Sequence, residues 1–407
     1  MIDSRDQMVG VGAMAHAPVL LVPGQAIREP TLIWSKILMT VLFLLISIGM
    51  TNLYSAAAGT SLFWSQLKNL ALACVGFYVC GWIISPRFYN SYAYWIYGAV
   101  CAQLVLVDII GGISMGAQRW LKVGPIVFQP SELAKIAVSI IVAKYFYTSR
   151  LSQPYTLRDL LPLSLIIGVA FLLIFAQPDL GTAGVCALIM TCQLCFIRIN
   201  GRSLAIAATG GLTVVLGAWF FILRDYQKLR VLNLINPDMD SSNTGYNALQ
   251  SFIAIGSGKF LGKGFMAGTQ TQLQFLPARH TDFIFAVFSE EHGFLGTSVV
   301  FILFVTLIYM GLAIAKNGKD VFASLLAVGM TGIIFVSFAI NTAMVLGLFP
   351  VVGVPLPFFS YGGTAMIVFC AAMGILVSIE RESLDLFRKV SPFQRKSANS
   401  RSSKQRS

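Results

Sequence analysis

The candidate fold and chemistry both centre on residues 272–287, which read QLQFLPARHTDFIFAV. Arg279, His280 and Asp282 lie within four positions and are followed at once by an apolar run. A carboxylate at the mouth of a membrane helix is energetically costly and is normally kept for a function. The sequence therefore predicts Asp282 as the chemical centre. The alternative, in which Thr281 or Asp282 simply caps the next helix, stays open here.

The composition is that of a membrane protein. Of the 407 residues, 56% are hydrophobic and 11% are charged, and the mean hydropathy is +0.76. Soluble domains carry about 25% charged residues, and this chain repeats apolar runs of roughly 20 residues, long enough to cross a hydrocarbon core. We expect an all-α polytopic membrane protein. The net charge of +12 indicates topology rather than nucleic-acid binding, because no soluble segment large enough to fold carries a basic face.

Cysteine and histidine give no metal or disulfide signal. All seven cysteines lie in apolar runs, and the one CxxC, Cys192 and Cys195, has no second pair or histidine beside it. Small packing residues are therefore the expected role. His16, His280 and His292 are too dispersed in the sequence to predict a zinc site.

About ten transmembrane helices are expected between two tails. Residues 1–32 form a polar N-terminal tail, residues 33–380 the membrane domain, and residues 381–407 a basic, disordered C-terminal tail. The eighth span is too long for one straight crossing and is expected to break at residues 293–296. The expected spans are 33–55, 67–85, 91–110, 133–148, 160–177, 179–197, 203–223, 283–315, 321–347 and 361–380.

Lysine and arginine predict the orientation, because they are retained on the cytoplasmic side. With the N-terminus inside, the inner loops hold eight of them and the tail from Arg381 holds eight more, so both termini are expected in the cytoplasm. Two outer loops break this pattern: residues 111–132, and the large extracytoplasmic loop 224–282 between helices 7 and 8. Their basic residues are suited to phosphate. Residues 245–256 predict a short amphipathic helix at the membrane surface.

Three further polar groups fall on the same outer side. FQPSELAK at 128–135 places Glu132 and Lys135 on one helix face, which suits either a capping element with an internal ion pair or a polar cavity wall. QPDLGT at 177–182 is a helix cap or part of the same lining. LFPVVGVPLPFFSYGG at 348–363 is non-helical and is either a surface loop or a segment facing the cavity. Together the groups predict one polar pocket open to the outside and to the membrane.

These motifs resemble the SEDS family (shape, elongation, division and sporulation proteins), membrane glycosyltransferases that polymerise peptidoglycan. The resemblance covers residues 33–380 and rests on GAQRWL, FQPSELAKIA, AQPDLGT, FLPARHTDFIFAV and PVVGVPLPFFSYGG. Residues 245–247 and 268–277 are similar to the elongation, RodA-like branch more than to the division, FtsW-like branch. Ala278 stands where the family often has an acidic residue, which weakens a role for that position but not for Asp282.

The resemblance implies a ten-helix fold and the polymerisation of lipid II (undecaprenyl-pyrophosphate disaccharide-pentapeptide) on the outer face of the cytoplasmic, or inner, membrane during cell elongation. It implies a class B penicillin-binding protein and the elongation machinery as partners. The essential aspartate of the family matches Asp282, and its characteristic loop residues match Arg119, Trp120, Gln129, Glu132 and Lys135.

The residues are compatible with that reaction. Forming a β-1,4 link from an α-linked lipid pyrophosphate inverts the anomeric carbon, which needs a base for the acceptor hydroxyl and positive charge on the departing pyrophosphate. Asp282 is the candidate base, while Arg119, Lys135 and Arg279 are candidate phosphate partners and His280 a substrate-binding residue. A divalent cation, Mg²⁺ or Mn²⁺, is a hypothesis that leaves little trace in a sequence. No organic cofactor is expected.

Two other functions use the same features. A lipid II flippase needs a polar path from the inner face, and the inner halves of the spans are nearly free of charge. A non-catalytic scaffold for a penicillin-binding protein would not need Asp282, Glu132 or Arg119. We therefore expect an enzyme, an inverting peptidoglycan glycosyltransferase. Whether Glu290 and Glu291 lie in the catalytic cavity stays open.

Overall fold

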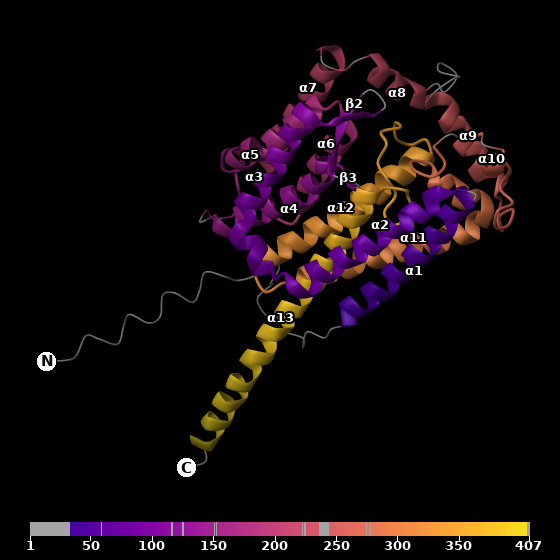
Figure 1. Ribbon diagram of the computed structural model, residues 1–407. Coiled ribbons are helices and arrows are strands. Elements are labelled where there is room, and N and C mark those ends of the chain that lie inside the picture. Colours follow the sequence, from indigo (N-terminus) through magenta and orange to yellow (C-terminus); the bar gives the residue numbers. More distant parts are fainter. Residues whose placement is uncertain are drawn as a thin grey trace.

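The fold is a bundle of long helices with one short stretch of strands (Figure 1). The structure is a computed structural model that describes residues 33–404 except 58, 115–116, 124–125, 150, 152, 222, 224, 236–243, 274 and 277, so the tail predicted over 1–32 lies outside the described residues. The elements are α1 Ile33–Ala56, α2 Ser61–Tyr78, the π-helix η1 Val79–Ile83, α3 Pro86–Ile110, β1 Gly112–Ser114, β2 Ala117–Val123, β3 Ile126–Phe128, α4 Pro130–Thr148, α5 Leu157–Ala176, α6 Leu180–Leu194, α7 Gly201–Phe221, α8 Asp225–Ile235, α9 Thr244–Ser257, α10 Thr269–Gln272, α11 Ile284–Lys316, α12 Val321–Val345 and α13 Gly363–Lys404.

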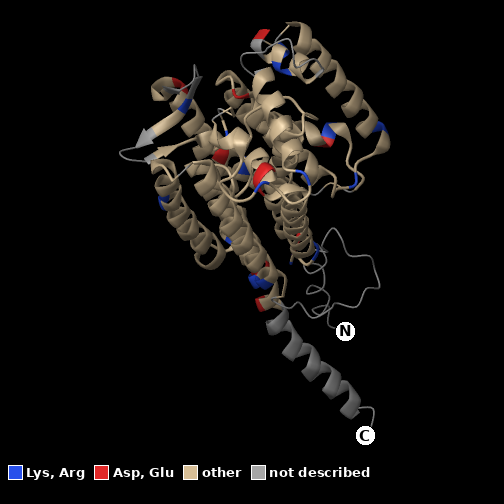
Figure 2. Cartoon of the chain, turned by 90° about the vertical axis from the view of Figure 1, so that its right-hand side faces the viewer, with Lys and Arg blue, Asp and Glu red and all other residues tan. Residues whose placement is uncertain are grey.

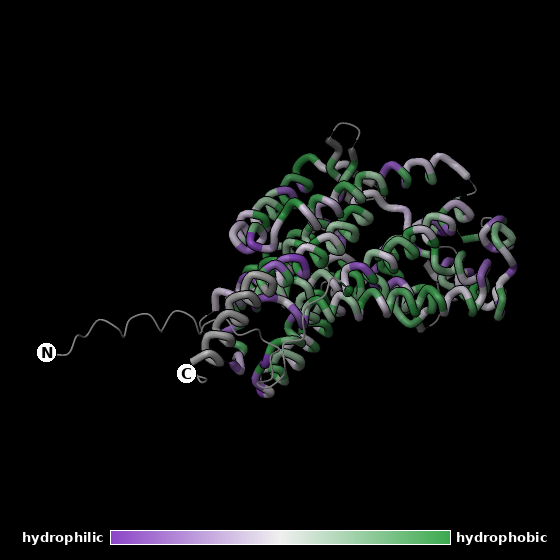
Figure 3. The backbone as a smooth tube through the Cα atoms, turned by 90° about the horizontal axis from the view of Figure 1, so that it is seen from below, coloured by the Kyte–Doolittle hydropathy of each residue, from purple (hydrophilic) through white to green (hydrophobic). Residues whose placement is uncertain are grey.

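Eight helices of the described chain are long and apolar enough to cross a membrane: α1, α2 with η1, α3, α5, α7, α11, α12 and α13. This confirms the all-α polytopic prediction. Two more predicted spans are also helical, but α4 carries three charged residues and α6 has only 15 residues, so the count of ten crossings stays a prediction. The long helices are mostly uncharged (Figure 2) and largely hydrophobic along the bundle (Figure 3).

The core of the bundle is formed by α12 and the first part of α13. In both helices 89% of the most apolar window is buried, against 28% in α3 and none in α7. A helix that is apolar all round is stable only where other helices surround it, and α12 has no charged residue in its 25 positions. α4, α6, α11 and α13 pack around α12, while α7 lies at the edge.

α11 breaks where the sequence predicted. Gly293 has φ 64° and ψ −163°, and a Cβ there would lie 2.3 Å from a backbone nitrogen of the loop 258–264, so glycine is required. The same loop forms hydrogen bonds with the backbone groups that lose their helical partners at the break. Two of its N–H groups donate to the carbonyls of Glu290 and Glu291 at 3.0 and 2.9 Å, and the N–H groups after the break donate back to it.

The two loops predicted to lie outside contain more secondary structure than the sequence indicated. Residues 112–128, expected as a polar loop, form three antiparallel strands in the order β1-β2-β3, and β2 pairs with both neighbours. The large loop holds α8, α9 and α10, which form an arc over one end of the bundle (Figure 1). The position of α9 confirms the short helix predicted over 245–256.

The C-terminal tail corrects the prediction. Residues 381–407 are predicted to be disordered because they are rich in Ser, Arg and Lys, but α13 continues as a helix to Lys404. Its first part beyond the bundle reads ERESLDLFRK from residue 380. Leucine, arginine, glutamate and lysine are strong helix formers, and this local preference prevails over the polar composition.

One end of the bundle gathers the start of α1, the start of α3 and the α11–α12 connection around α13. The Glu380 carboxylate accepts a hydrogen bond from the Ser35 N–H at 2.7 Å. Glu382 lies 2.6 Å from Arg87 and 2.5 Å from Lys319. Since α13 begins about 18 residues earlier, its first turn lies roughly 27 Å away, at 1.5 Å per residue. The polar clusters described next surround that first turn.

Candidate functional site

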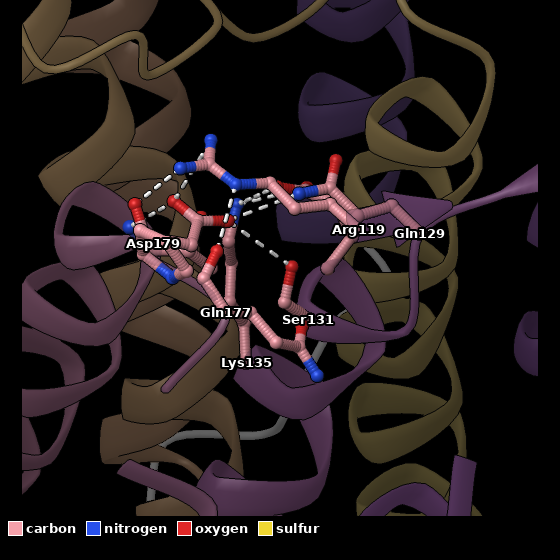
Figure 4. Close-up of polar contacts among 9 residues, drawn as sticks. Arg119, Gln129, Ser131, Lys135, Gln177 and Asp179 are labelled. Carbon is pink, nitrogen blue, oxygen red and sulfur yellow. Dashed lines mark hydrogen bonds and ion pairs between the residues drawn. The ribbon is translucent and has the colours of Figure 1, made fainter. Parts of the chain in front are cut away.

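The first polar cluster joins β2, the start of α4 and the turn between α5 and α6 (Figure 4). Asp179 caps α6, because its carboxylate accepts from the Thr182 N–H at 3.3 Å and from the Thr182 hydroxyl at 3.0 Å. The same carboxylate accepts from the Gln129 amide at 3.1 Å and lies 3.8 Å from the Arg119 guanidinium. The turn 177–182 is therefore both a helix cap and part of a polar cluster.

An ion pair in the first two turns of α4 is almost completely buried. Lys135 Nζ lies 2.7 and 2.8 Å from the two carboxylate oxygens of Glu132, and the side chains are 1% and 6% exposed. The ammonium also lies over the ring of Phe369 in α13, 5.6 Å from its centroid. The predicted pair thus forms and faces the bundle interior, where charged groups within a membrane helix belong.

The second polar cluster holds Asp282, in the turn before α11. The N-cap of α11 is Phe283, without a side-chain capping bond, and the Thr281 hydroxyl donates to the Ala278 carbonyl at 3.4 Å. Helix capping therefore does not account for the carboxylate. Burial raises the pKa of Asp282 to about 6, against the opposing effect of the positive charge on Arg230. A carboxylate with a pKa near neutral pH is suited to act as a general base.

The backbone on both sides of this carboxylate is fixed by three donors. The carbonyl groups of residues 280–282 accept, in order, from the Tyr361 N–H at 2.8 Å, the Ser360 hydroxyl at 2.6 Å and the Asn341 amide at 3.0 Å. All three donors come from α12 or from the segment before α13. The motif that the sequence predicted as the chemical centre is therefore held by a part of the chain about 60 to 80 residues away.

The non-helical segment 351–362 connects the two clusters. A Cβ on Gly353 would lie 3.7 Å from Asp282 Oδ2, and a Cβ on Gly181 would lie 2.7 Å from the Val352 carbonyl oxygen. The 177–182 turn and the Asp282 carboxylate therefore flank neighbouring residues of this segment. Six of its 12 residues are buried, which excludes the surface-loop alternative and is consistent with irregular backbone enclosed by protein.

The other predicted residues lie close to these clusters. Arg279 donates to the Thr271 carbonyl at 2.5 Å. His280 packs edge-on against Tyr361, with ring centroids 6.3 Å apart, and burial together with the charge of Arg279 lowers the pKa of His280, so its ring is neutral at pH 7. Trp120 is partly buried on β2, beside the partly exposed Arg119.

Glu290 and Glu291, whose placement the sequence left open, are buried away from solvent and brace neighbouring elements. Glu290 lies 2.7 Å from the Lys263 ammonium and accepts from the Gln270 N–H at 3.0 Å. Glu291 accepts from the hydroxyl of Ser55 in α1. Through these contacts, the loop after α9 and the helix α1 are both held against the break in α11.

The predicted divalent cation has no ligand cluster of its own in the described part of the chain, where no three His, Cys, Asp or Glu side chains converge. Mg²⁺ is commonly held by one or two carboxylates together with substrate phosphates. Such a site would not be complete without the substrate, so the cation stays a prediction and no chemical step is assigned to it.

A cavity of about 210 Å³ lies between α8, α9 and the end of α12. Arg230 and Asn233 supply polar groups to its lining, and Phe252, Met344 and Phe349 supply apolar walls. Arg230 is also the charged residue that acts on the pKa of Asp282, which places the cavity next to the second cluster. Apolar walls with a few polar groups are typical of ligand sites.

Sequence reasoning missed two buried amides that support the site. Gln66 of α2 accepts from the Gly362 N–H at 3.2 Å and donates to the Ser360 carbonyl at 3.4 Å, and Asn341 holds the Asp282 carbonyl. Both are fully buried. A buried amide is kept where it has hydrogen-bond partners, so the one Asn in the otherwise apolar α12 was a signal for Asn341. Gln66 lies beside Ser65, Lys68 and Asn69 and gives no such signal.

Comparison with known proteins identifies the family. Residues 29–384 match the family model for the cell cycle proteins FtsW, RodA and SpoVE. The chain belongs to this family. Among its relatives, peptidoglycan glycosyltransferase MrdB of Escherichia coli K12 is 44% identical over 307 residues, which cover 75% of this chain and 82% of MrdB. Stage V sporulation protein E of Bacillus subtilis is 32% identical over 365 residues, covering 85% and 97%. The resemblance to the SEDS family is confirmed.

Solved structures of the family share the fold. A chain of a peptidoglycan synthase complex, described as coordinating polymerization and crosslinking, superposes with a TM-score of 0.74 at 28% identity and covers 85% of this chain and 97% of that one. The rod shape determining protein RodA of Thermus thermophilus gives a TM-score of 0.64 at 26% identity, with 85% and 96% covered. The family fold therefore extends over most of this chain.

Proposed function

We propose that this chain is a peptidoglycan glycosyltransferase that joins lipid II units into glycan strands during cell elongation. The observation that carries the proposal is Asp282, a partly buried carboxylate whose pKa is raised to about 6 and which lies in the second cluster against the segment 351–362. Support comes from the relative MrdB, a peptidoglycan glycosyltransferase 44% identical to this chain.

In the proposed reaction, Asp282 is the general base. Its carboxylate takes the proton from the 4-hydroxyl of the acceptor sugar while that oxygen attacks the anomeric carbon of the donor. The bond from the anomeric carbon to the pyrophosphate oxygen breaks, and its electron pair leaves with the pyrophosphate. Attack opposite the leaving group turns the α-linked donor into a β-1,4-linked product, so a single step inverts the anomeric carbon.

Positive side chains in the two clusters stabilise the leaving pyrophosphate in this proposal. Arg119 is the accessible cation of the first cluster, with 31% of its side chain exposed, and a guanidinium matches the geometry of phosphate oxygens. Lys135 is buried against Glu132, and its ammonium adds positive charge near the start of α4. Arg230 lines the cavity beside Asp282. Charge fixed before the reaction stabilises the transition state most effectively.

The proposed orientation places both termini in the cytoplasm and both polar clusters outside. The end of the bundle remote from the clusters holds Arg87 and Lys319, as the retention of basic residues in the cytoplasm would require. A class B penicillin-binding protein is the proposed partner. The fold shared with a chain of a complex for polymerization and crosslinking supports it. A divalent cation bound with the substrate is part of the same proposal.

The test is lipid II polymerisation in detergent by the purified chain together with a transpeptidase-inactive synthase partner. We compare the wild type with Asp282→Asn and with Asp320→Asn. Asp320 is a matched control, because it also precedes a helix and caps α12 by accepting from the Ala323 N–H at 2.8 Å, at the end of the bundle remote from the clusters. We expect polymer from the wild type and Asp320→Asn, and at least about 100-fold less from Asp282→Asn.

Two outcomes would contradict the proposal. Equal polymer from Asp282→Asn would remove this carboxylate from the chemistry. A wild-type chain that forms no polymer, under conditions in which a control polymerase works, would favour the alternatives. Movement of lipid II across liposome membranes would then support a flippase, and its absence would support a scaffold.

A further inference from the structure

Asn341 is an isolated amide within the central apolar helix. It lies in α12, is 0% exposed, and its Nδ2 donates to the Asp282 carbonyl at 3.0 Å and to the Val354 carbonyl at 2.8 Å. A side-chain amide has two N–H donors, so both donors of Asn341 are used on two separate segments of the chain.

The two acceptors lie on the two segments that meet at the Asp282 carboxylate. Asp282 carries the carboxylate, and Gly353, against which that carboxylate lies, immediately precedes Val354. The amide therefore sets the distance between the residue that carries the proposed base and the glycine on which the base rests. A displacement of about 1 Å near reacting groups can lower a rate about 100-fold, so this distance matters for the reaction.

The chain contains a matched asparagine without this relation to the base. Asn52 in α1 is 1% exposed and donates to the Ile284 carbonyl at 3.0 Å, two residues beyond Asp282. Within the described residues, the side-chain oxygens of Asn52 and Asn341 are both buried without a hydrogen-bond partner. The two amides therefore share burial and chemistry and differ in the backbone that they hold.

We propose that Asn341 is a positioning residue that holds Asp282 against the segment 351–362 and thereby fixes the base for polymerisation. This inference rests on the proposed glycosyltransferase function. Asn341 acts through the backbone of Asp282 and touches neither substrate nor the reacting atoms in this scheme.

The charged and titratable groups around Asp282 determine what the loss of Asn341 would change. Arg230 reaches Asp282 from α8, and Arg279 and His280 precede it on its own segment. Tyr361 is the titratable residue of segment 351–362, and α12 has none. Replacing Asn341 by an uncharged residue thus leaves every one of these charges in place. A carboxylate released from its partly buried position regains water, and its pKa falls.

The experiment compares Asn341→Leu and Asn341→Ser with Asn52→Leu and Asn52→Ser in the lipid II polymerisation assay with the synthase partner, as a function of pH. For both Asn341 variants we expect kcat to fall about tenfold or more, with the KM for lipid II within about twofold of the wild type. We expect the acidic limb of the rate profile to move to lower pH. The Asn52 variants should keep the wild-type profile.

Folded protein is measured for every variant by elution of the complex in detergent, and rates are divided by the folded amount. If Asn341→Leu does not fold, Asn341→Ser still decides the question, because its hydroxyl can donate to a carbonyl of its own helix as Thr331 does at 2.8 Å. An unchanged pH profile, or kcat losses equal to those of the Asn52 variants, would overturn the inference. A wild-type chain that makes no polymer refutes the glycosyltransferase function itself and this inference with it.

Discussion

The buried ion pair of α4 gives the sharpest test of the energetics of the site. We consider Glu132→Gln, Lys135→Met and the double variant. The two side chains are 6% and 1% exposed and lie 2.7 Å apart, so water screens neither charge. Removing one partner leaves an uncompensated buried charge, which costs about 3–5 kcal/mol. Replacing both by uncharged side chains of similar volume is often neutral or stabilising.

The double-mutant cycle then has a definite expected form. Each single variant should lose about 3–5 kcal/mol of the free energy of unfolding, and the double variant should recover most of that loss, which gives a coupling energy of about 3 kcal/mol or more. Unfolding is followed by titration with a denaturing detergent in mixed micelles. Single variants that each lose less than about 1 kcal/mol would refute the reasoning, because such a loss is typical of exposed pairs.

Polymerisation by the same variants separates structure from chemistry. If the charge of Lys135 helps to stabilise the departing pyrophosphate, the double variant regains its stability but stays about tenfold or more below the wild type in rate per folded molecule. A double variant that recovers both stability and rate would show that the pair only supports the fold.

Three further predictions follow from single contacts. Burial raises the pKa of Asp282 to about 6 from an ordinary value of 3.8, so ionisation of this carboxyl as the pH rises between these values destabilises the fold. Asp282→Asn should therefore have a higher Tm than the wild type above pH 6 and lose that advantage below about pH 4. A variant whose Tm equals that of the wild type at both pH values would contradict the effect of burial on this pKa. Gly262 has φ +81°, and a Cβ there would lie 2.1 Å from the Glu291 carbonyl oxygen, so Gly262→Ala should lower the free energy of unfolding by about 2 kcal/mol or more. Gly256→Ala is the control, because a Cβ at Gly256 would meet nothing within 4 Å. Equal free energies of unfolding for the two variants would disprove the close packing of the loop 258–264 against the α11 break. Glu290→Gln weakens a fully buried acceptor and its pairing with Lys263 at 2.7 Å. The free energy of unfolding should fall by about 1–3 kcal/mol in the same detergent titration. An unchanged midpoint would show that Glu290 does not hold the loop after α9 against α11.

Features that depend on length and periodicity could be predicted from the sequence. The apolar spans follow from runs long enough to cross a membrane. The break in α11 follows from a 33-residue helix with two nearby glycines. The helix α9 follows from apolar residues spaced three and four apart. Each of these signals extends over many residues and depends little on what packs against the segment.

Features decided by few residues could not be predicted. β1 and β3 have three residues each, too few for an alternating pattern to be distinguished from a loop. The tail after residue 380 has the polar composition of a disordered segment, while its side chains favour a helix. In the tail the two signals conflict, and composition predicts the wrong one.

The sequence could nominate candidate residues for the site, but it could not predict their contacts. Asp282, Arg119 and Lys135 carry chemistry in their side chains and stand out in an apolar sequence. Their partners depend on which helices adjoin: Arg119 meets Asp179 across 60 residues of chain, and the Asp282 backbone meets Asn341 across 59. No local sequence pattern predicts these contacts, because they form only when the helices pack around α12.

The irregular segment 351–362 links the structural support of the bundle to the position of Asp282. Backbone that is neither helix nor sheet can lie inside a membrane bundle only where neighbouring groups satisfy its N–H and carbonyl groups. Here the Asn341 amide donates to the Val354 carbonyl, and the Gln66 side-chain oxygen accepts from the Gly362 N–H. Because the segment 280–282 is equally irregular, the donors that satisfy its carbonyls also fix the position of Asp282. Removing such a donor therefore leaves a carbonyl unpaired and releases the proposed base at the same time. Stability and pH profile therefore have to be measured on the same variants.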